Sequence, residues 1–389
     1  MFLDVDRRPL IMGDMPSPRD SSPGEASSAA SAAASSASRA SPGRLLAAMG
    51  GRNRGRPPVW IMRQAGRYLP GYQAFRRQHS FVEMCRRPEI ATEVSLEPYR
   101  EFGVDGVIVF YDILFLPQAM GAPLEYTERG PVFLRALRRS EDVRDLHAPG
   151  PEAAAPVVET LKRLRATLPT ETALLGFAGA PFTLAAYLVE GDLRRSGDRI
   201  RRLIHEDPSM LRELLERLTT ATVDYLAGQV RAGADAIQLF DTWAGLLGPA
   251  DFREFALPYQ QRIFEELNAL DVPTVLYVNG CSSLLECMGR CGARVLSLDW
   301  RVSLQDARRR LGNGVALQGN LDPAALFGSP ETVRRRTLET LESLPGDPAY
   351  IFSLGHGILP ETPVESVRAL IETVRAFDGS AATTAEGSD

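Results

Sequence analysis

One short stretch of this chain places arginines around small residues. Residues 58–67 read PVWIMRQAGR, and Arg76 follows a short segment later. Arginine forms forked hydrogen bonds with carboxylates and phosphates, and Ala65 and Gly66, between Arg63 and Arg67, let the backbone approach a ligand closely. The apolar residues before Arg63 predict a strand at residues 59–62. We therefore expect a strand that leads into an anion-binding loop, the alternative being a surface loop in an arginine-rich protein.

A single acidic residue ends a second apolar run. Asp112 comes after residues 106–110 and is followed by apolar side chains. A carboxylate in apolar surroundings is costly to ionise unless a cation or N–H donors stabilise it. Asp112 is therefore a candidate for binding a cation or an array of N–H groups. The alternative is that it caps a helix.

Three further side chains follow strand-like runs. Tyr187 comes after a turn of small residues and can point its hydroxyl toward a ligand, or it can pack with the hydroxyl at the rim. Thr242 can contact a ligand or cap a helix. His356 lies between two glycines, where it can act as a general acid or donate to an anion, or be a turn residue without a role.

Other kinds of chemistry lack their residues. No nucleophile elbow with serine, histidine and acid is present, and no H-x-x-x-H or CxxC pattern predicts a metal site. Lys162 is the only lysine, and it falls on the charged side of a predicted amphipathic helix, so Schiff-base chemistry has no good candidate. These residues favour proton transfer on a polyanionic substrate, with no metal and no cofactor.

Strands and helices alternate along most of the chain. The strand-like runs are residues 59–62, 106–110, 173–177, 236–240, 274–278, 295–298, 315–318 and 350–353. The helical segments include residues 88–102, 208–232, 250–270, 303–311, 330–344 and 363–377. This alternation predicts an α/β fold, a single-domain (β/α)₈ TIM barrel over residues 44–379. In such a barrel the candidate residues, which follow strands, meet at one end. A doubly wound sheet is the alternative, weakened because no G-x-G-x-x-G follows a strand.

Composition limits the partners. The chain has 389 residues, 44% of them hydrophobic, and a formal net charge of −5, which argues against general nucleic-acid binding. No apolar run approaches the roughly 18 residues that cross a membrane. The four cysteines are typical of reduced thiols, so we expect a cytoplasmic protein. Residues 1–43, rich in Ala, Ser and Pro, and residues 380–389 are expected to be disordered. If the first segment were a transit peptide, the location would be a plastid, but its acidic residues disfavour that.

Several blocks of the sequence together resemble one enzyme family. They are PVWIMRQAGR (58–67), FYDIL (110–114), GFAGAPFTLAAYLVEG (176–191), QGNLDP (318–323) and LGHG (354–357). In content and order they are similar to the motifs of the uroporphyrinogen decarboxylases of haem and porphyrin (tetrapyrrole) biosynthesis. The resemblance extends from Arg44 to the last predicted helix.

That resemblance implies a cofactor-independent lyase, acting as a homodimer. It would remove CO₂ from the four acetate side chains of uroporphyrinogen III to give coproporphyrinogen III. By position, the substrate contacts would be Arg63, Gln64, Ala65, Gly66, Arg67, Arg76, Asp112, Tyr187, Thr242 and His356. The catalytic residues would be Arg63, Asp112, Tyr187 and His356, with Asp112 facing the pyrrole N–H groups. The alternatives are a methyltransferase of the same barrel superfamily, which would use zinc, and a non-catalytic porphyrinogen-binding protein.

Overall fold

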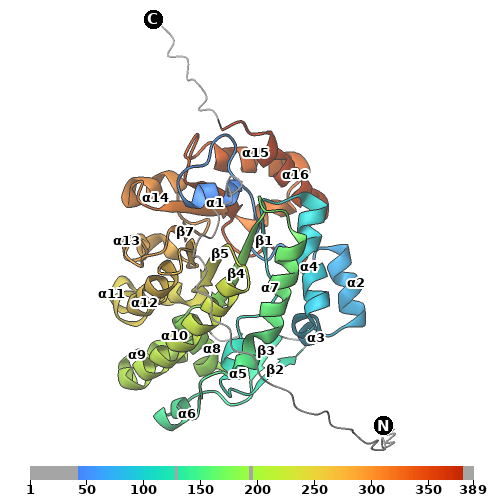
Figure 1. The fold of residues 1–389 in the computed structure, drawn as a ribbon. Helices are drawn as coiled ribbons and strands as arrows, with labels where there is room; N and C mark the ends of the chain where they lie inside the picture. The colour runs from blue at the N-terminus through green and yellow to red at the C-terminus, as the bar shows by residue number, and fades with distance from the viewer. Residues whose placement is uncertain (1–42, 128–129, 192–195, 380–389) are drawn as a thin grey trace, which may run out of the picture. The chain divides into compact units, whose positions relative to one another are not determined.

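Seven parallel strands, joined mainly by helices, form one curved sheet (Figure 1). The computed structural model describes residues 43–127, 130–191 and 196–379, so the two expected disordered segments, apart from Gly43, lie outside it. The strands, in their order across the sheet, are β1 (Gly106–Ile108), β4 (Ala173–Gly179), β5 (Ala236–Phe240), β6 (Thr274–Tyr277), β7 (Val295–Ser297), β8 (Ala316–Leu321) and β9 (Tyr350–Leu354). Because this order follows the sequence without reversal, the doubly wound alternative is wrong.

The first predicted strand closes the sheet into a barrel. Val59 pairs with Phe352 of β9 as an isolated parallel bridge. The amide of Phe352 donates to the Pro58 carbonyl at 2.9 Å, and on the other side the amide of Asp105 donates to the Val59 carbonyl at 2.8 Å. The (β/α)₈ barrel is thus confirmed. The prediction of a full strand at residues 59–62 was wrong in extent. Beyond Trp60 the side chain of Gln64 takes the place of the backbone hydrogen bonds to β1.

Helices connect the strands and surround them (Figure 1). They are α1 (Arg44–Met49), α2 (Pro70–Gln78), α3 (Phe81–Arg86), α4 (Pro88–Phe102), α5 (Phe115–Ala119), α6 (Ser140–Arg144), α7 (Ala155–Thr167), α8 (Pro181–Glu190), α9 (Asp198–Glu206), α10 (Pro208–Arg231), α11 (Pro249–Phe255), α12 (Leu257–Asn268), α13 (Leu285–Met288), α14 (Leu304–Leu311), α15 (Pro330–Leu341) and α16 (Val364–Ala376). Short 3₁₀ turns are η1 (Pro151–Ala154), η2 (Thr242–Leu246), η3 (Cys281–Ser283) and η4 (Pro323–Phe327).

The predicted helices are present, with one interruption. The segment 250–270 is broken at Ala256, which separates α11 from α12. Pro258 has no N–H to donate, so a continuous helix cannot keep its hydrogen bonds there. Elsewhere local signals set the starts: Ser329 accepts from the Thr332 amide before Pro330 opens α15, and Asp207 caps α10 in the same way.

The two ends of the barrel differ. At the end where the strands begin, Leu45 and Ala48 of α1 pack with Trp60 and the first residues of the strands. Inside, the indole of Trp60 donates to Gln318 at 2.8 Å, and Gln318 donates to Ser297 at 2.9 Å. The other end, where the strands finish, carries the loops with the candidate residues, as expected for such a barrel. In the described residues no helix is long and apolar enough to cross a membrane.

Candidate active site

A cavity of about 1030 Å³ opens at the carboxyl ends of the first strands. This volume is at the upper end of the roughly 300–1,000 Å³ typical of small-molecule pockets. The lining residues come from the arginine loop, α2, the start of α3, residues 112–114, a hairpin and α8. They include Arg63, Arg67, Arg76, Arg77, Phe81, Asp112, Tyr126 and Tyr187.

Four arginines are among the residues that line this cavity. Arg63, Arg67 and Arg76 were expected to act together, and the structure brings them to one cavity with exposed side chains. Arg77 is an addition that the motif did not indicate. Arg63 has a left-handed backbone with φ of 63°, which is uncommon for a residue with a side chain. A Cβ at Gly357 would lie 2.4 Å from Arg63 Cδ, so the glycine leaves room for this arginine.

The loop that carries these arginines is held by Gln64. Its side-chain oxygen accepts from the Ile61 amide at 3.0 Å, and its side-chain nitrogen donates to the Gly106 carbonyl at 3.0 Å. Its own carbonyl accepts from the Tyr68 hydroxyl at 2.8 Å. Gln64 is buried and fully occupied in this way, so the geometry assigns it to support of the loop. Ala65 and Gly66 are half-buried and do not line the cavity.

Asp112 lies in the cavity wall. Its Oδ1 accepts from the Leu114 amide at 2.8 Å, two residues beyond it and just before α5 begins. The alternative that Asp112 caps a helix is wrong, because Leu114 is the N-cap residue of α5 and that helix has no side-chain cap; the bond to Leu114 closes a turn before the helix. Burial raises the pKa of Asp112, while the Leu114 N–H, the Tyr126 hydroxyl and Arg63 oppose that rise. A cation or N–H donors brought by a ligand would favour the ionised form further.

A network of contacts links Tyr187 to Asp241 and Trp243, the residues on either side of Thr242. The Thr183 hydroxyl donates to Asp241 Oδ1 at 2.7 Å and accepts from the Trp243 amide at 3.0 Å. The Trp243 ring packs edge-on against Tyr187, with centroids 5.7 Å apart. Tyr187 lines the cavity, whereas Thr242 is half-buried at the start of η2 and does not line it.

His356 is near the cavity but not in its lining. Its Nδ1 accepts from the Gly357 amide at 2.8 Å, so the neutral ring carries its proton on Nε2. Burial, together with Arg63 and Arg301, lowers the pKa of His356 to about 4. The ring is therefore neutral at pH 7, where it can donate one hydrogen bond but is not an imidazolium acid.

The hairpin wall was not predicted from the sequence. Strands β2 (Leu124–Thr127) and β3 (Gly130–Phe133) pair antiparallel, and Tyr126, Thr127, Gly130 and Pro131 line the cavity. The available signal was a short polar and apolar alternation in β2 followed by Gly130 and Pro131. Strands of this length are too brief to be distinguished from a loop.

Other candidate chemistry does not assemble in the described residues. The cysteines, Cys85, Cys281, Cys287 and Cys291, are buried and unpaired by disulfides. No group of three or more His, Cys, Asp or Glu side chains there is close enough to hold a metal ion. Lys162 is exposed on α7, as expected.

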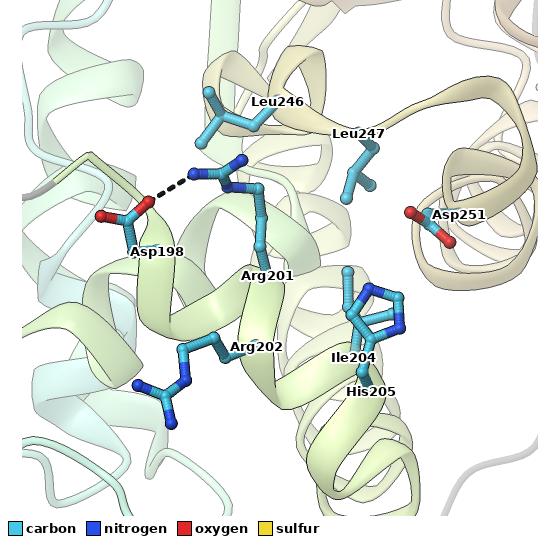
Figure 2. A pocket seen from close by; sticks show the side chains of 8 residues that line it. All are labelled: Asp198, Arg201, Arg202, Ile204, His205, Leu246, Leu247 and Asp251. Carbon is cyan, nitrogen blue, oxygen red and sulfur yellow. Dashed lines mark hydrogen bonds and ion pairs between the residues drawn. The ribbon is translucent and has the colours of Figure 1, made fainter.

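A second, smaller cavity of about 510 Å³ shares no lining residue with the cavity that Arg63, Arg67, Arg76 and Arg77 line. Figure 2 shows the side chains that line it. Its lining residues are Asp198, Arg201, Arg202, Ile204, His205, Leu246, Leu247 and Asp251. Arg201 pairs with Asp198, as the dashed line in Figure 2 shows, and Arg202 pairs with Glu206 at 2.7 Å. Because both arginines are paired within α9, this cavity is less suited to a polyanion than the first.

Solved structures share the fold at low sequence identity. A methyltransferase from Methanosarcina mazei superposes with a TM-score of 0.73, at 24% identity, over 85% of this chain and 97% of its own. A B12-independent methionine synthase from Shewanella sp. gives a TM-score of 0.51 at 12% identity, over 83% and 96% of the two chains. These likenesses support the barrel and do not bear on the reaction.

Sequence comparisons are more specific. The family model for uroporphyrinogen decarboxylase (URO-D) matches residues 41–377. Uroporphyrinogen decarboxylase of Pelobacter propionicus is 43% identical, over 87% of this chain and 99% of its own. That of Gloeobacter violaceus is 45% identical, over 83% and 94%. The chain belongs to the uroporphyrinogen decarboxylase family.

Proposed function

We propose that this protein is a carboxy-lyase that converts uroporphyrinogen III to coproporphyrinogen III by removing CO₂ from four acetate side chains. The observation that carries the proposal is one cavity whose lining includes Arg63, Arg67 and Arg76 together with the poorly solvated Asp112. Family membership supports the same reaction.

The charge of the cavity suits the substrate. Uroporphyrinogen carries eight carboxylates, and this protein has a net charge of −5, so binding needs a local cationic surface. The exposed guanidinium groups at the first strand end supply it, and a fourth comes from Arg77. Each can form two parallel hydrogen bonds with a carboxylate.

Decarboxylation needs an acceptor for the electrons of the broken C–C bond. Protonation of a pyrrole carbon makes the ring cationic, and the ring accepts those electrons as CO₂ leaves. A second proton then converts the remaining methylene carbon into a methyl group, and the proton first added to the ring carbon leaves, which restores the neutral pyrrole. Asp112, close to the pyrrole N–H groups, would stabilise the cation electrostatically in a site with little water. This sequence of steps calls for no metal and no organic cofactor.

The acidity of the nearby groups limits which of them can donate the proton. Arg63, His356 and a bound water are three groups that could deliver the proton. Arginine holds its proton too tightly to be a good acid. His356 has a pKa near 4 and is neutral at pH 7. We therefore propose that a water molecule, hydrogen-bonded by Arg63 or His356, delivers the proton. Tyr187 and the neutral His356 would form hydrogen bonds with the substrate.

The deciding experiment is an anaerobic incubation with freshly reduced uroporphyrinogen III, with and without a chelator. Products are oxidised and separated by carboxylate number. We expect seven- to four-carboxylate products in equal yield in both samples. Binding without loss of carboxylates would favour a non-catalytic porphyrinogen-binding protein, and neither binding nor turnover would favour a methyltransferase.

The assembly and location are part of the same proposal. We propose a cytoplasmic homodimer that binds neither nucleic acid nor membranes, as family resemblance and the mildly acidic composition indicate. Light scattering after gel filtration should give about twice the chain mass of 42.6 kDa. A mass of one chain would contradict the dimer without affecting the proposed reaction.

A further inference from the structure

A hydroxyl group in the cavity wall lacks a well-shaped hydrogen bond to the described residues. Tyr126, on β2, is half-buried in the lining of the arginine cavity, and its hydroxyl oxygen is fully buried. This oxygen forms no well-shaped hydrogen bond with any other described residue. Buried polar groups are nearly always hydrogen-bonded, so this exception calls for an explanation.

The position of this ring is fixed by packing. Its centroid lies 5.3 Å from that of Phe81 and 5.6 Å from that of Phe115, which belong to α3 and α5. The hairpin that carries it is fastened by the Phe133 amide, which donates to the Gly191 carbonyl at 2.9 Å. Packing against α3 and α5, together with the hydrogen bond from the hairpin to Gly191, therefore holds the Tyr126 ring in the cavity wall.

The group that this hydroxyl approaches is Asp112. Only one protein N–H, that of Leu114, forms a well-shaped hydrogen bond with the carboxylate among the described residues, and it uses Oδ1. The Tyr126 hydroxyl is close enough to lower the pKa of Asp112. Burial first, and then the Asp112 charge, raise the pKa of Tyr126, so the hydroxyl keeps its proton and can donate it in a hydrogen bond.

We propose that Tyr126 is a positioning residue that donates a hydrogen bond to the Asp112 carboxylate and keeps it ionised and oriented when substrate fills the cavity. Tyr126 and Asp112 do not form a well-shaped hydrogen bond in this structure, and exclusion of water on substrate binding would shorten and strengthen their contact. The role in turnover rests on the proposed function, whereas the hydrogen bond itself does not.

Other charged or titratable groups also face Asp112 from the surrounding elements. They are Arg63 from the loop, Cys85 from α3, Tyr111 beside it, Tyr187 from α8 and Tyr225 from α10. Of these, Arg63 lowers the pKa of Asp112, as Tyr126 does. A change at Tyr126 alone should therefore weaken the ionised form without abolishing it.

The first test is the pH profile of kcat/KM for Tyr126→Phe, which removes only the hydroxyl. A hydrogen bond to a charged group favours the ionised form about tenfold, so we expect the acidic limb to move up by about one pH unit. The matched control is Tyr111→Phe. The Tyr111 ring also packs on Phe115, at 4.9 Å, but it does not line the cavity. The control should keep the wild-type limb.

The second test does not depend on turnover. Aspartate labelled with ¹³C at the carboxyl carbon reports the titration of Asp112, with its signal assigned by loss in Asp112→Asn. We expect that signal to titrate about one pH unit higher in Tyr126→Phe than in wild type. If Tyr126→Phe shows this shift relative to wild type, but the wild-type protein does not decarboxylate uroporphyrinogen III, the hydrogen bond is supported and the proposed reaction is refuted.

Two results would overturn the inference. One is that Tyr126→Phe leaves both the acidic limb of the kcat/KM pH profile and the titration of Asp112 unchanged. The other is a raised KM with no shift of the limb, which would mean that the hydroxyl contacts the substrate and does not act through Asp112.

Discussion

At the scale of single residues, Asp112 takes part both in a local turn and in the cavity lining. One oxygen accepts from the Leu114 amide and shapes the turn before α5. The carboxylate also belongs to the cavity lining. A local turn contact therefore fixes the direction of the group, and burial makes it responsive to N–H donors on a ligand.

Asp112→Asn should keep the fold and lose most of the decarboxylation rate. The amide oxygen can still accept from Leu114, but a neutral side chain cannot stabilise a cationic pyrrole. Removal of one such electrostatic contact costs roughly 100- to 1,000-fold in kcat. Single-turnover rates, with melting temperature as the folding control, measure this. Near-normal turnover would remove Asp112 from the mechanism.

Asp241 should make stability depend on pH. Burial raises its pKa from 3.8 to about 6, against the hydrogen bonds from Thr183 and Gln260. The folded protein then binds more protons than the unfolded chain between these values, so stability falls as pH rises from about 4 to about 6. The carboxylate is fully buried, and the loss should reach about 3 kcal/mol.

The measurement is the difference in free energy of unfolding between wild type and Asp241→Asn at a series of pH values. Taking the difference is necessary because His356 acts oppositely: its lowered pKa makes stability fall as pH drops from 6.5 toward about 4. Wild type should lose stability relative to Asp241→Asn as pH rises through this range. Parallel curves would contradict the assignment.

At the scale of elements, the cavity depends on how the loop after β5 is tied to α8. Thr183, in the first turn of α8, connects the two through its hydroxyl, which contacts both Asp241 and the Trp243 amide. Trp243 in turn packs on Tyr187, further along α8. These contacts join the residues after β4 and after β5, and they fix the position of Tyr187, which lines the cavity.

Thr183→Val should destabilise the protein and impair substrate binding. Valine has the same shape but removes one of the two hydrogen bonds to Asp241 Oδ1, which keeps the amide of residue 183, and it leaves the Trp243 N–H without its acceptor, at a cost of about 1–3 kcal/mol. Thr183→Ser keeps the hydroxyl and should restore most of the loss. Chemical denaturation and KM are the two readouts. Equal behaviour of the valine and serine variants would show that the hydroxyl is not the link.

At the scale of the whole barrel, closure depends on side chains. The carboxylate of Asp105 accepts from the Val59 amide at 2.8 Å and pairs with both terminal nitrogens of Arg56 at 2.8 and 2.9 Å. Together with Gln64, it replaces the backbone ladder between the first segment and β1. The seam of the barrel thus lies directly beneath the arginine loop.

Asp105→Ala should open this seam. It leaves a partly buried arginine and a backbone N–H unpaired, so we expect a loss of about 2–4 kcal/mol in stability. KM should rise as well, because Arg63 and Arg67 follow the released segment. The control is Glu159→Ala, which removes an ion pair with Arg163 on the surface of α7 and should cost under about 1 kcal/mol. Equal losses in the two variants would argue against a special role for the seam.

Local pattern was enough for most of the framework. The alternation of apolar runs and amphipathic helices predicted eight barrel strands, and seven of these runs are strands in the structure. It also placed α4 over residues 88–102, as observed. It failed at residues 250–270, where Pro258 breaks the helix, and at 59–62, where pairing ends after one bridge. Both failures reflect hydrogen bonds, which apolar periodicity does not report.

The sequence by itself determined the fold class, the family and the order in which Arg63, Arg67, Arg76, Asp112 and Tyr187 follow strands, because periodicity and motifs are local properties of the chain. Only the tertiary structure decided what each side chain faces. It turned Gln64 into a support of the loop, left His356 neutral, and brought Tyr126 of an unpredicted hairpin beside Asp112. Burial, charge state and hydrogen-bond partners depend on distant segments that pack together, and a local pattern does not contain them.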